Sequence, residues 1–225
     1  MGGEGHAGTV GPMSESLWLA RRDRLGLCDL LDELGPDAPT LCGGWSTRDL
    51  AAHLVARDRR PDSVPGLVVD RLNGWSERVR LGEAERPYAE LVTRLRAGPP
   101  SWSPLALPRF DRLGNTHEFF VHFEDVRRAE TGWTARALDD TAEADLWKVL
   151  GWFRRRAFKA APVGVVLQRP DGTQLRAASG DTTVTVNGPP GELLLYAFGR
   201  EDQALVDLDG APEALAVLAA TERAW

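Results

Sequence analysis

The chain has 225 residues, 43% of them hydrophobic and 27% charged, and its formal net charge is -6. This acidic balance argues against nucleic-acid binding through a basic field, and no apolar run approaches the ~18 residues of a membrane span, so we expect neither partner. The two cysteines, Cys28 and Cys42, give no disulfide framework, which favours a cytoplasmic location.

The first predicted helix follows a glycine-rich lead-in. Residues 1–13 lack the basic and apolar regions of a secretory signal, so we expect a disordered segment there. Residues 14–34 carry leucines at helical spacing with charged residues between them. This pattern predicts an amphipathic helix that ends near Gly35 and Pro36.

A second helix is expected to begin at Ser46. Ser46 and Asp49 form a capping box in which aspartate replaces the usual glutamate at the third position. Leu50, His53 and Leu54 then share one face of the helix. We therefore expect His53 to point inward, between two leucines.

The helical half of the chain continues with several further segments. They are a short, ambiguous helix within 61–74, a helix over 86–97, a proline-containing loop over 101–113, a helix over 115–129 and a long helix over 139–160. Asn115 or Thr116 is the expected N-cap of the helix over 115–129.

The pattern changes at Pro162 from helical spacing to short strands. The expected elements are strands over 163–168, 182–186 and 204–208, a hairpin turn over 170–173, and helices over 190–198 and 212–221. The chain thus predicts a helical domain over 14–161 that is joined to a small α+β domain over 162–225.

The helix over 115–129 carries the strongest indication of chemistry. Glu118 and His122 are four residues apart, so both project from one face, and that face also carries apolar residues. Burying unpaired polar groups is costly, and a divalent metal is an economical reason for it. His53 is a third inward-facing ligand on another helix. The alternative is that these are hydrogen-bonded core residues without a metal.

Two histidines and one carboxylate leave open positions on a metal, which is the ligand count of a catalytic site. Zn²⁺ fits these ligands, and Ni²⁺ or Fe²⁺ remains an alternative. The two histidines of His117-Glu118-Phe119-Phe120-Val121-His122 are one residue further apart than in the zinc-protease motif, which excludes Glu118 as a protease base.

Other polar residues of the same helix are expected to face water. His117 lies about 100° around the helix from Glu118 and is predicted to be exposed, with the rim of the pocket as the alternative. The charged residues near the end of the helix are predicted to form a solvated face with local ion pairs; they are Glu124, Asp125, Arg127 and Arg128.

Two stretches resemble a known family. Residues 45–54 resemble the W-[ST]-x-x-D-L-x-x-H segment of the DinB-like superfamily, and Glu118 and His122 match its later E-x-x-x-H. The branch with the best match is named for mycothiol-dependent maleylpyruvate isomerase. Residues 190–200 resemble the small C-terminal domain of those proteins, which has a sterol-carrier-protein-like topology.

The resemblance implies a fold, a site and an activity. It implies an N-terminal DinB-like four-helix bundle that holds a metal through His53, Glu118 and His122. It also implies an actinobacterial enzyme, monomeric or homodimeric, that uses mycothiol or a similar low-molecular-weight thiol on a small electrophilic substrate, as a transferase or an isomerase. A bound Zn²⁺ can hold a thiol as the nucleophilic thiolate.

Three residues outside the triad are weaker candidates. The resemblance implies that Arg200 faces the cleft between the domains, where it could bind a substrate carboxylate as a catalytic residue; the alternative is a helix C-cap. Cys42 could approach the metal or be a small buried residue. Asp49 could orient a metal-bound group or act only as a helix cap.

Two other functions remain open at this point. A metal-dependent hydrolase or lyase without a thiol could use the same triad to activate water. A non-enzymatic protein that binds a small apolar ligand would need no metal. Fold resemblance alone does not choose among these functions.

Overall fold

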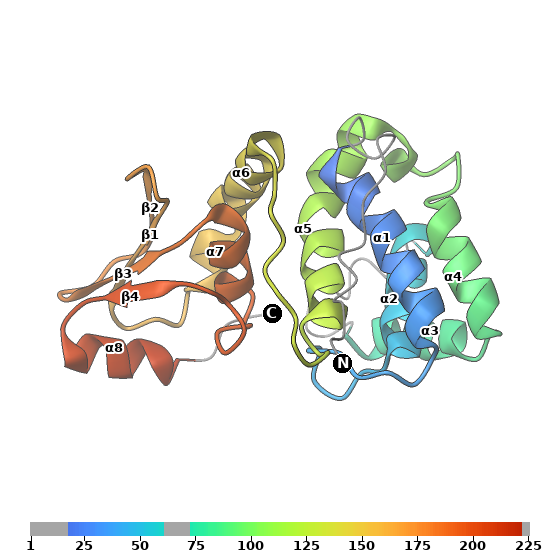
Figure 1. The fold of residues 1–225 in the computed structure, drawn as a ribbon, viewed down its shortest axis with the longest axis horizontal. Helices are drawn as coiled ribbons and strands as arrows, with labels where there is room; N and C mark the ends of the chain where they lie inside the picture. Colours follow the sequence, from blue (N-terminus) through green and yellow to red (C-terminus); the bar gives the residue numbers. More distant parts are fainter. Residues whose placement is uncertain (1–17, 61–72, 222–225) are drawn as a thin grey trace, which may run out of the picture.

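The computed structural model describes residues 18–60 and 73–221. Figure 1 shows a helical part beside a part that combines helices with a small sheet. The predicted lead-in over 1–13, the start of the first helix and most of the ambiguous segment over 61–74 lie outside the described residues. No helix of the described residues is long and apolar enough to cross a membrane.

The helical part has a core of leucines from several helices. Its elements are α1 (Leu19–Leu34), α2 (Thr47–Arg59), α3 (Asn73–Ala84), α4 (Tyr88–Ala97), the 3₁₀ helix η3 (Pro104–Ala106) and α5 (Pro108–Arg127). Helix α1 packs against α5 and α4, while α2 packs against α3 and α4. Leu27, Leu50, Leu91 and Phe119 are among the residues of the shared core. This packing places α2 and α5 in the same bundle.

The predicted capping box begins α2. Ser46 Oγ accepts a hydrogen bond from the Asp49 amide, and Asp49 Oδ2 accepts one from the Ser46 amide at 3.1 Å. These bonds satisfy backbone donors that a helix start leaves unpaired. Asp49 also forms an ion pair with Arg80 at 2.5 Å. The helix-cap reading of Asp49 is confirmed, and the cap fixes the start of the helix that carries His53.

One prediction in this part was wrong, and one helix was missed. Helix α5 begins at Pro108 rather than at Asn115, and Pro108 occupies the first turn, where a missing amide costs nothing. Asn115 is instead buried in the helix, where its Nδ2 donates to Asp111 Oδ1 at 2.7 Å. Helix α3 was not predicted beyond its first residues, because few apolar residues mark its buried side.

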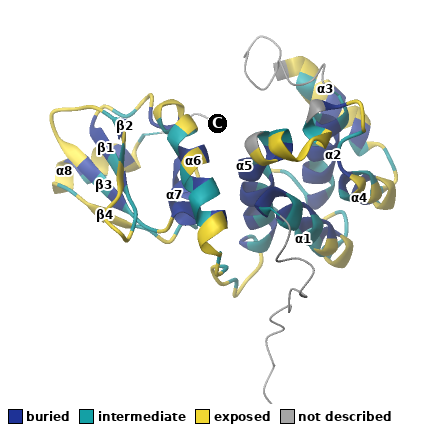
Figure 2. Cartoon of the chain, turned by 90° about the horizontal axis from the view of Figure 1, so that it is seen from above, coloured by how far each residue is buried: buried dark blue, intermediate teal, exposed yellow. Residues whose placement is uncertain are grey.

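The second part contains a four-stranded sheet. Its elements are α6 (Asp140–Ala157), β1 (Gly164–Gln168), β2 (Gln174–Ala178), β3 (Thr183–Asn187), α7 (Pro190–Ala197), β4 (Asp207–Asp209) and α8 (Pro212–Ala219). The strand order is β2-β1-β3-β4, with β1 and β3 parallel and the other pairs antiparallel. Figure 2 shows α6 and α7 between the sheet and α5, with α8 on the opposite side of the sheet.

Helix α6 shares a hydrophobic core with the sheet. Leu146 and Leu150 of α6 belong to the same buried cluster as Val165, Val184 and Leu194. The boundary near Ala161 and Pro162 stays a prediction, because α6 precedes it in sequence and yet packs with the elements that follow it.

The two parts meet along α5, where the solvated face predicted for residues 124–128 was wrong. Glu124, Asp125 and Arg128 are buried, and Arg127 is half-buried. Arg128 donates to Glu124 Oε2 at 2.6 Å and to Glu192 Oε1 of α7 at 2.7 Å. Helix α5 has no solvent face here because the helical part covers one side and α7 the other.

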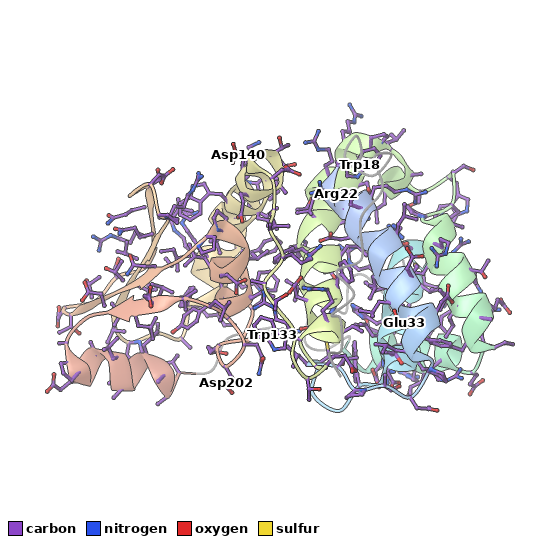
Figure 3. The ribbon with its side chains drawn as sticks, in the orientation of Figure 1. Trp18, Arg22, Glu33, Trp133, Asp140 and Asp202 are labelled. Carbon is purple, nitrogen blue, oxygen red and sulfur yellow. The ribbon has the colours of Figure 1, made fainter. Side chains whose placement is uncertain are left out.

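The two parts are in close contact at the start of α7. A side chain at Gly191, in the first turn of α7, would bring its Cβ within 2.9 Å of Phe120 Cζ on α5. The guanidinium of Arg128 lies 4.4 Å from the centre of the Trp133 ring. Figure 3 shows the side chains between α5 and the α6–α7 pair, with Trp133 labelled among them.

Candidate metal centre and active site

The three predicted ligands lie together. The ligand atoms of His53 on α2 and of Glu118 and His122 on α5 are all within 4.8 Å of one another. Glu118 Oε2 lies 3.8 Å from His53 Nε2 and 3.5 Å from His122 Nε2. The side chains are mostly buried but not sealed, with 13–18% of each exposed.

This spacing fits one divalent ion. Ligand atoms at ~2.0–2.2 Å from a tetrahedral Zn²⁺ lie ~3.4 Å from one another. The separations of 3.5 and 3.8 Å around Glu118 Oε2 are close to that value. Imidazole nitrogen and carboxylate oxygen also have the donor chemistry that Zn²⁺ prefers. The residues present therefore fit a metal.

The carboxylate of Glu118 is shared between two sets of partners. Oε2 faces the two histidines, whereas Oε1 lies 3.3 Å from Arg57 Nε and 3.4 Å from His117 Nε2. Burial alone would raise the pKa of Glu118, but Arg57 and the three histidines outweigh it and hold the pKa well below its usual value. Glu118 is therefore ionised at neutral pH, as a metal ligand must be.

His122 is oriented by a second carboxylate. Its Nδ1 lies 3.0 Å from Asp125 Oδ2, one turn further along α5, and its Nε2 faces Glu118. Such a carboxylate–histidine pair fixes the ring and the tautomer of a metal ligand. Burial lowers the pKa of His122, but hydrogen bonds to Asp125, Cys42 and Glu118 raise it well above its usual value.

His53 has a more apolar environment than His122. Its ring centre lies 5.2 Å from that of Trp45. Burial lowers the pKa of His53 further than its contact with Glu118 raises it. A neutral imidazole is the form that binds a metal.

The second part contributes Arg200 to the site. Arg200 Nε and Nη2 donate to the two oxygens of Asp125, both at 2.8 Å. Burial alone would raise the pKa of Asp125, but its bonds to His122 and Arg200 hold the pKa far below its usual value. Arg200, Asp125 and His122 thus form a continuous chain of hydrogen bonds across the contact between the two parts.

Cys42 lies on the Nδ1 side of His122, whereas Glu118 lies on the Nε2 side. Its Sγ lies 3.0 Å from Asp125 Oδ2 and 3.6 Å from His122 Nδ1. The Nε2 atom of His122, and not Nδ1, faces Glu118. Cys42 therefore contacts the residues that support the triad rather than adding a fourth donor to it.

A cavity of about 430 Å³ opens onto the triad. Both parts of the molecule contribute to its walls, which are formed by Cys42, Gly43, Trp45, His53, His117, Glu118, Val121, His122, Phe198 and Arg200. This volume is within the range of small-molecule sites, about 300–1,000 Å³.

The prediction that His117 is exposed was wrong. Only 8% of its surface is accessible, and its ring lies 4.7 Å from Phe153 on α6 and 5.8 Å from Phe198 after α7. Its Nδ1 has no hydrogen-bond partner among the described residues. His117 is buried because the second part covers the side of α5 on which it lies.

Two supporting residues were not expected at the site from the sequence. Arg57 follows His53 by four residues on α2, and Asp125 follows His122 by three on α5. Both spacings place the supporting residue on the same helix face as a ligand. That signal was available, but a charged residue at helical spacing is more often a solvated one.

Comparison with known proteins gives one clear likeness. No protein-family model matches the sequence, and no curated protein matches it significantly. A crystal structure of the mycothiol-dependent maleylpyruvate isomerase superposes with a TM-score of 0.58 at 18% identity, over 88% of this chain and 93% of that one. A histidine-to-alanine mutant of that isomerase superposes with a TM-score of 0.55 at 19% identity, over the same shares. The chain therefore has the fold of the mycothiol-dependent maleylpyruvate isomerase, which confirms the resemblance seen in the motifs.

Proposed function

We propose that this protein is a metal-dependent enzyme that brings a low-molecular-weight thiol, of the mycothiol type, to a small electrophilic substrate. The reaction is a thiol transfer or a thiol-assisted isomerisation. The observation that carries the proposal is the convergence of His53 Nε2, Glu118 Oε2 and His122 Nε2 at the wall of one cavity. Three protein ligands leave a position for a further ligand.

The fold assignments belong to the same proposal. Helices α1, α2, α4 and α5 correspond to a DinB-like four-helix bundle within 14–161, and the segment 162–225 corresponds to a sterol-carrier-protein-like domain. The likeness to the isomerase structures, over 88% of the chain, supports both assignments.

Zn²⁺ is the proposed metal, with Ni²⁺ or Fe²⁺ as alternatives that the same donors accept. When bound, the ion supplies a Lewis acid that keeps a thiol in its thiolate form. Asp125 and Arg57 orient the histidine and carboxylate ligands. Trp45 and Phe198 contribute aromatic surface to the cavity wall.

Arg200 is the proposed substrate-binding residue. Two of its N–H groups bond to Asp125, one bonds to the Phe198 carbonyl and one contacts Cys42 Sγ at 3.5 Å. A guanidinium has five N–H groups, so one remains for a substrate carboxylate in the cavity. Arg200 would then serve both as a support for Asp125 and as a contact of the substrate.

Metal analysis and calorimetry test the proposal. The purified protein should contain about one divalent metal per chain, and a chelator should remove it. Mycothiol should bind the metal-loaded protein and not the metal-free protein. Absence of any thiol binding by the loaded protein would reject the thiol assignment. Turnover of an ester or amide without thiol would then identify a metal-dependent hydrolase.

A further inference from the structure

The two carboxylate oxygens of Glu118 contact different partners. Oε2 faces both histidines of the triad, and Oε1 is 3.3 Å from Arg57 Nε. The side chain of Arg57 is only 13% exposed, so solvent does not screen this contact strongly. An oxygen that accepts from a guanidinium is a weaker donor to a metal. Glu118 therefore offers one oxygen to the metal rather than two.

Arg57 is held rigidly in this position. Its Nη1 donates to Asn115 Oδ1, and its Nη2 donates to the Gly114 carbonyl at 2.6 Å. Asn115 is itself fixed by its bond to Asp111 Oδ1 at 2.7 Å. The guanidinium cannot leave Glu118 without breaking these bonds to α5. Its positive charge is thus a permanent feature of the site.

Asp125, the second carboxylate at the site, is neutralised in the same way. Arg200 forms two bonds of 2.8 Å with it, so each carboxylate is matched by one arginine. The histidines are neutral when they bind a metal. The charge of a divalent ion in the triad is therefore not compensated by Glu118 and Asp125. A further group near His53, formed by Asp49, Glu77 and Arg80, has one more negative than positive charge and offsets only part of the charge of a divalent ion.

We propose that Arg57 is a positioning residue that keeps Glu118 monodentate and the loaded site cationic, so that the site selects an anion as the further metal ligand. The inference rests on the proposed function and specifies its ligand class: a thiolate, a carboxylate or another monoanion is preferred over a neutral donor. Arg200 contributes to the same positive charge of the loaded site, because it neutralises Asp125.

Ligand titrations of the Co²⁺-loaded protein test this proposal. Co²⁺ is the probe because its visible absorption changes when a ligand binds. Azide serves as the monoanion and imidazole as the neutral donor. The Arg57→Gln variant should bind azide about tenfold more weakly or worse, since a full charge is removed at a short distance in a partly buried site. Its affinity for imidazole should change by no more than about twofold.

Two further variants separate charge from geometry. Arg57→Lys keeps the charge and should retain most of the azide affinity. Arg48→Gln is the matched control, because Arg48 lies on the same helix and donates to the carbonyls of Ala84 and Arg86 rather than to the triad. It should bind both ligands like the parent protein.

The outcomes are distinct. Unchanged azide binding in Arg57→Gln, an equal loss of azide and imidazole binding, or an equal azide loss in Arg57→Lys would overturn the inference. If Arg57→Gln does not fold, Arg57→Met removes the same charge while keeping an unbranched side chain in the packing, and it should likewise weaken azide in preference to imidazole. Failure of the parent protein to bind Co²⁺ or Zn²⁺ would reject the proposed function itself, and the inference with it.

Discussion

The helical part and the sheet-containing part contribute differently to the site. The helical part holds all three candidate ligands, together with Arg57, inside one packed bundle. The second part contributes Arg200 and Phe198 to the cavity wall, and Arg200 reaches His122 through Asp125. The positions of the candidate metal ligands thus depend on packing within one core. The position of Arg200, the proposed substrate contact, depends on how the two parts are joined.

The largest expected effect comes from breaking the contact between the two parts. Arg128 bridges Glu124 and Glu192, and the Arg128 side chain is only 1% exposed. Arg128→Ala leaves Glu192 buried without its partner and should lower the free energy of unfolding by ~3–5 kcal/mol. Urea unfolding measures this change. Arg96→Ala removes exposed pairs with Asp29 and Asp32 within the helical part and should cost ~0–1 kcal/mol, so equal losses would contradict the role of the contact between the two parts.

Removal of a candidate ligand should weaken metal binding without changing the stability of the metal-free protein. His53→Ala deletes one of three proposed donors and should weaken Zn²⁺ binding by more than ~100-fold, which exceeds the usual effect of losing a supporting residue. Competition with a chromogenic chelator measures the affinity. In the absence of metal, the variant should unfold at nearly the same urea concentration as the parent. Full metal occupancy in His53→Ala would reject the triad.

Asp125 tests the link between the two parts. Asp125→Asn weakens both the His122 bond and the Arg200 pair and should lower Zn²⁺ affinity by ~10–100-fold. Asp145→Asn is a suitable control, because Asp145 forms its ion pairs with Arg112 and Lys148 at the surface. Metal affinity that is equal in both variants would show that Asp125 does not support the ligand.

The smallest effect is expected at the start of α2. Ser46→Ala removes the capping box and should destabilise the protein by ~1 kcal/mol. Metal affinity should remain near that of the parent, because His53 lies well inside the helix and is held by core packing. A large loss of metal affinity in this variant would show that the helix end controls the ligand geometry. Thermal unfolding and chelator competition separate the two effects.

Local patterns predicted most of the helices and the order of the elements. The capping box at Ser46 and the glycine and proline signals around α4 and α7 depend on neighbours in the chain, so the sequence contains them. The start of α5 was misplaced because Asn115 has the residue type of a cap. Its side chain instead donates to Asp111, one turn earlier in α5, and accepts from Arg57, which is 58 positions away and leaves no local signal.

The sequence by itself determined the three candidate ligands, since the spacing of Glu118 and His122 on one helix and the leucines around His53 require only helical geometry. Only the tertiary structure showed that His117, Asp125 and Arg128 are buried. Helical periodicity tells which residues share a face, but not which surface covers that face. The covering surface comes from residues far along the chain, such as Arg200, which lies 75 positions from Asp125. The charge balance around the candidate metal site therefore emerges only when the two parts are packed together.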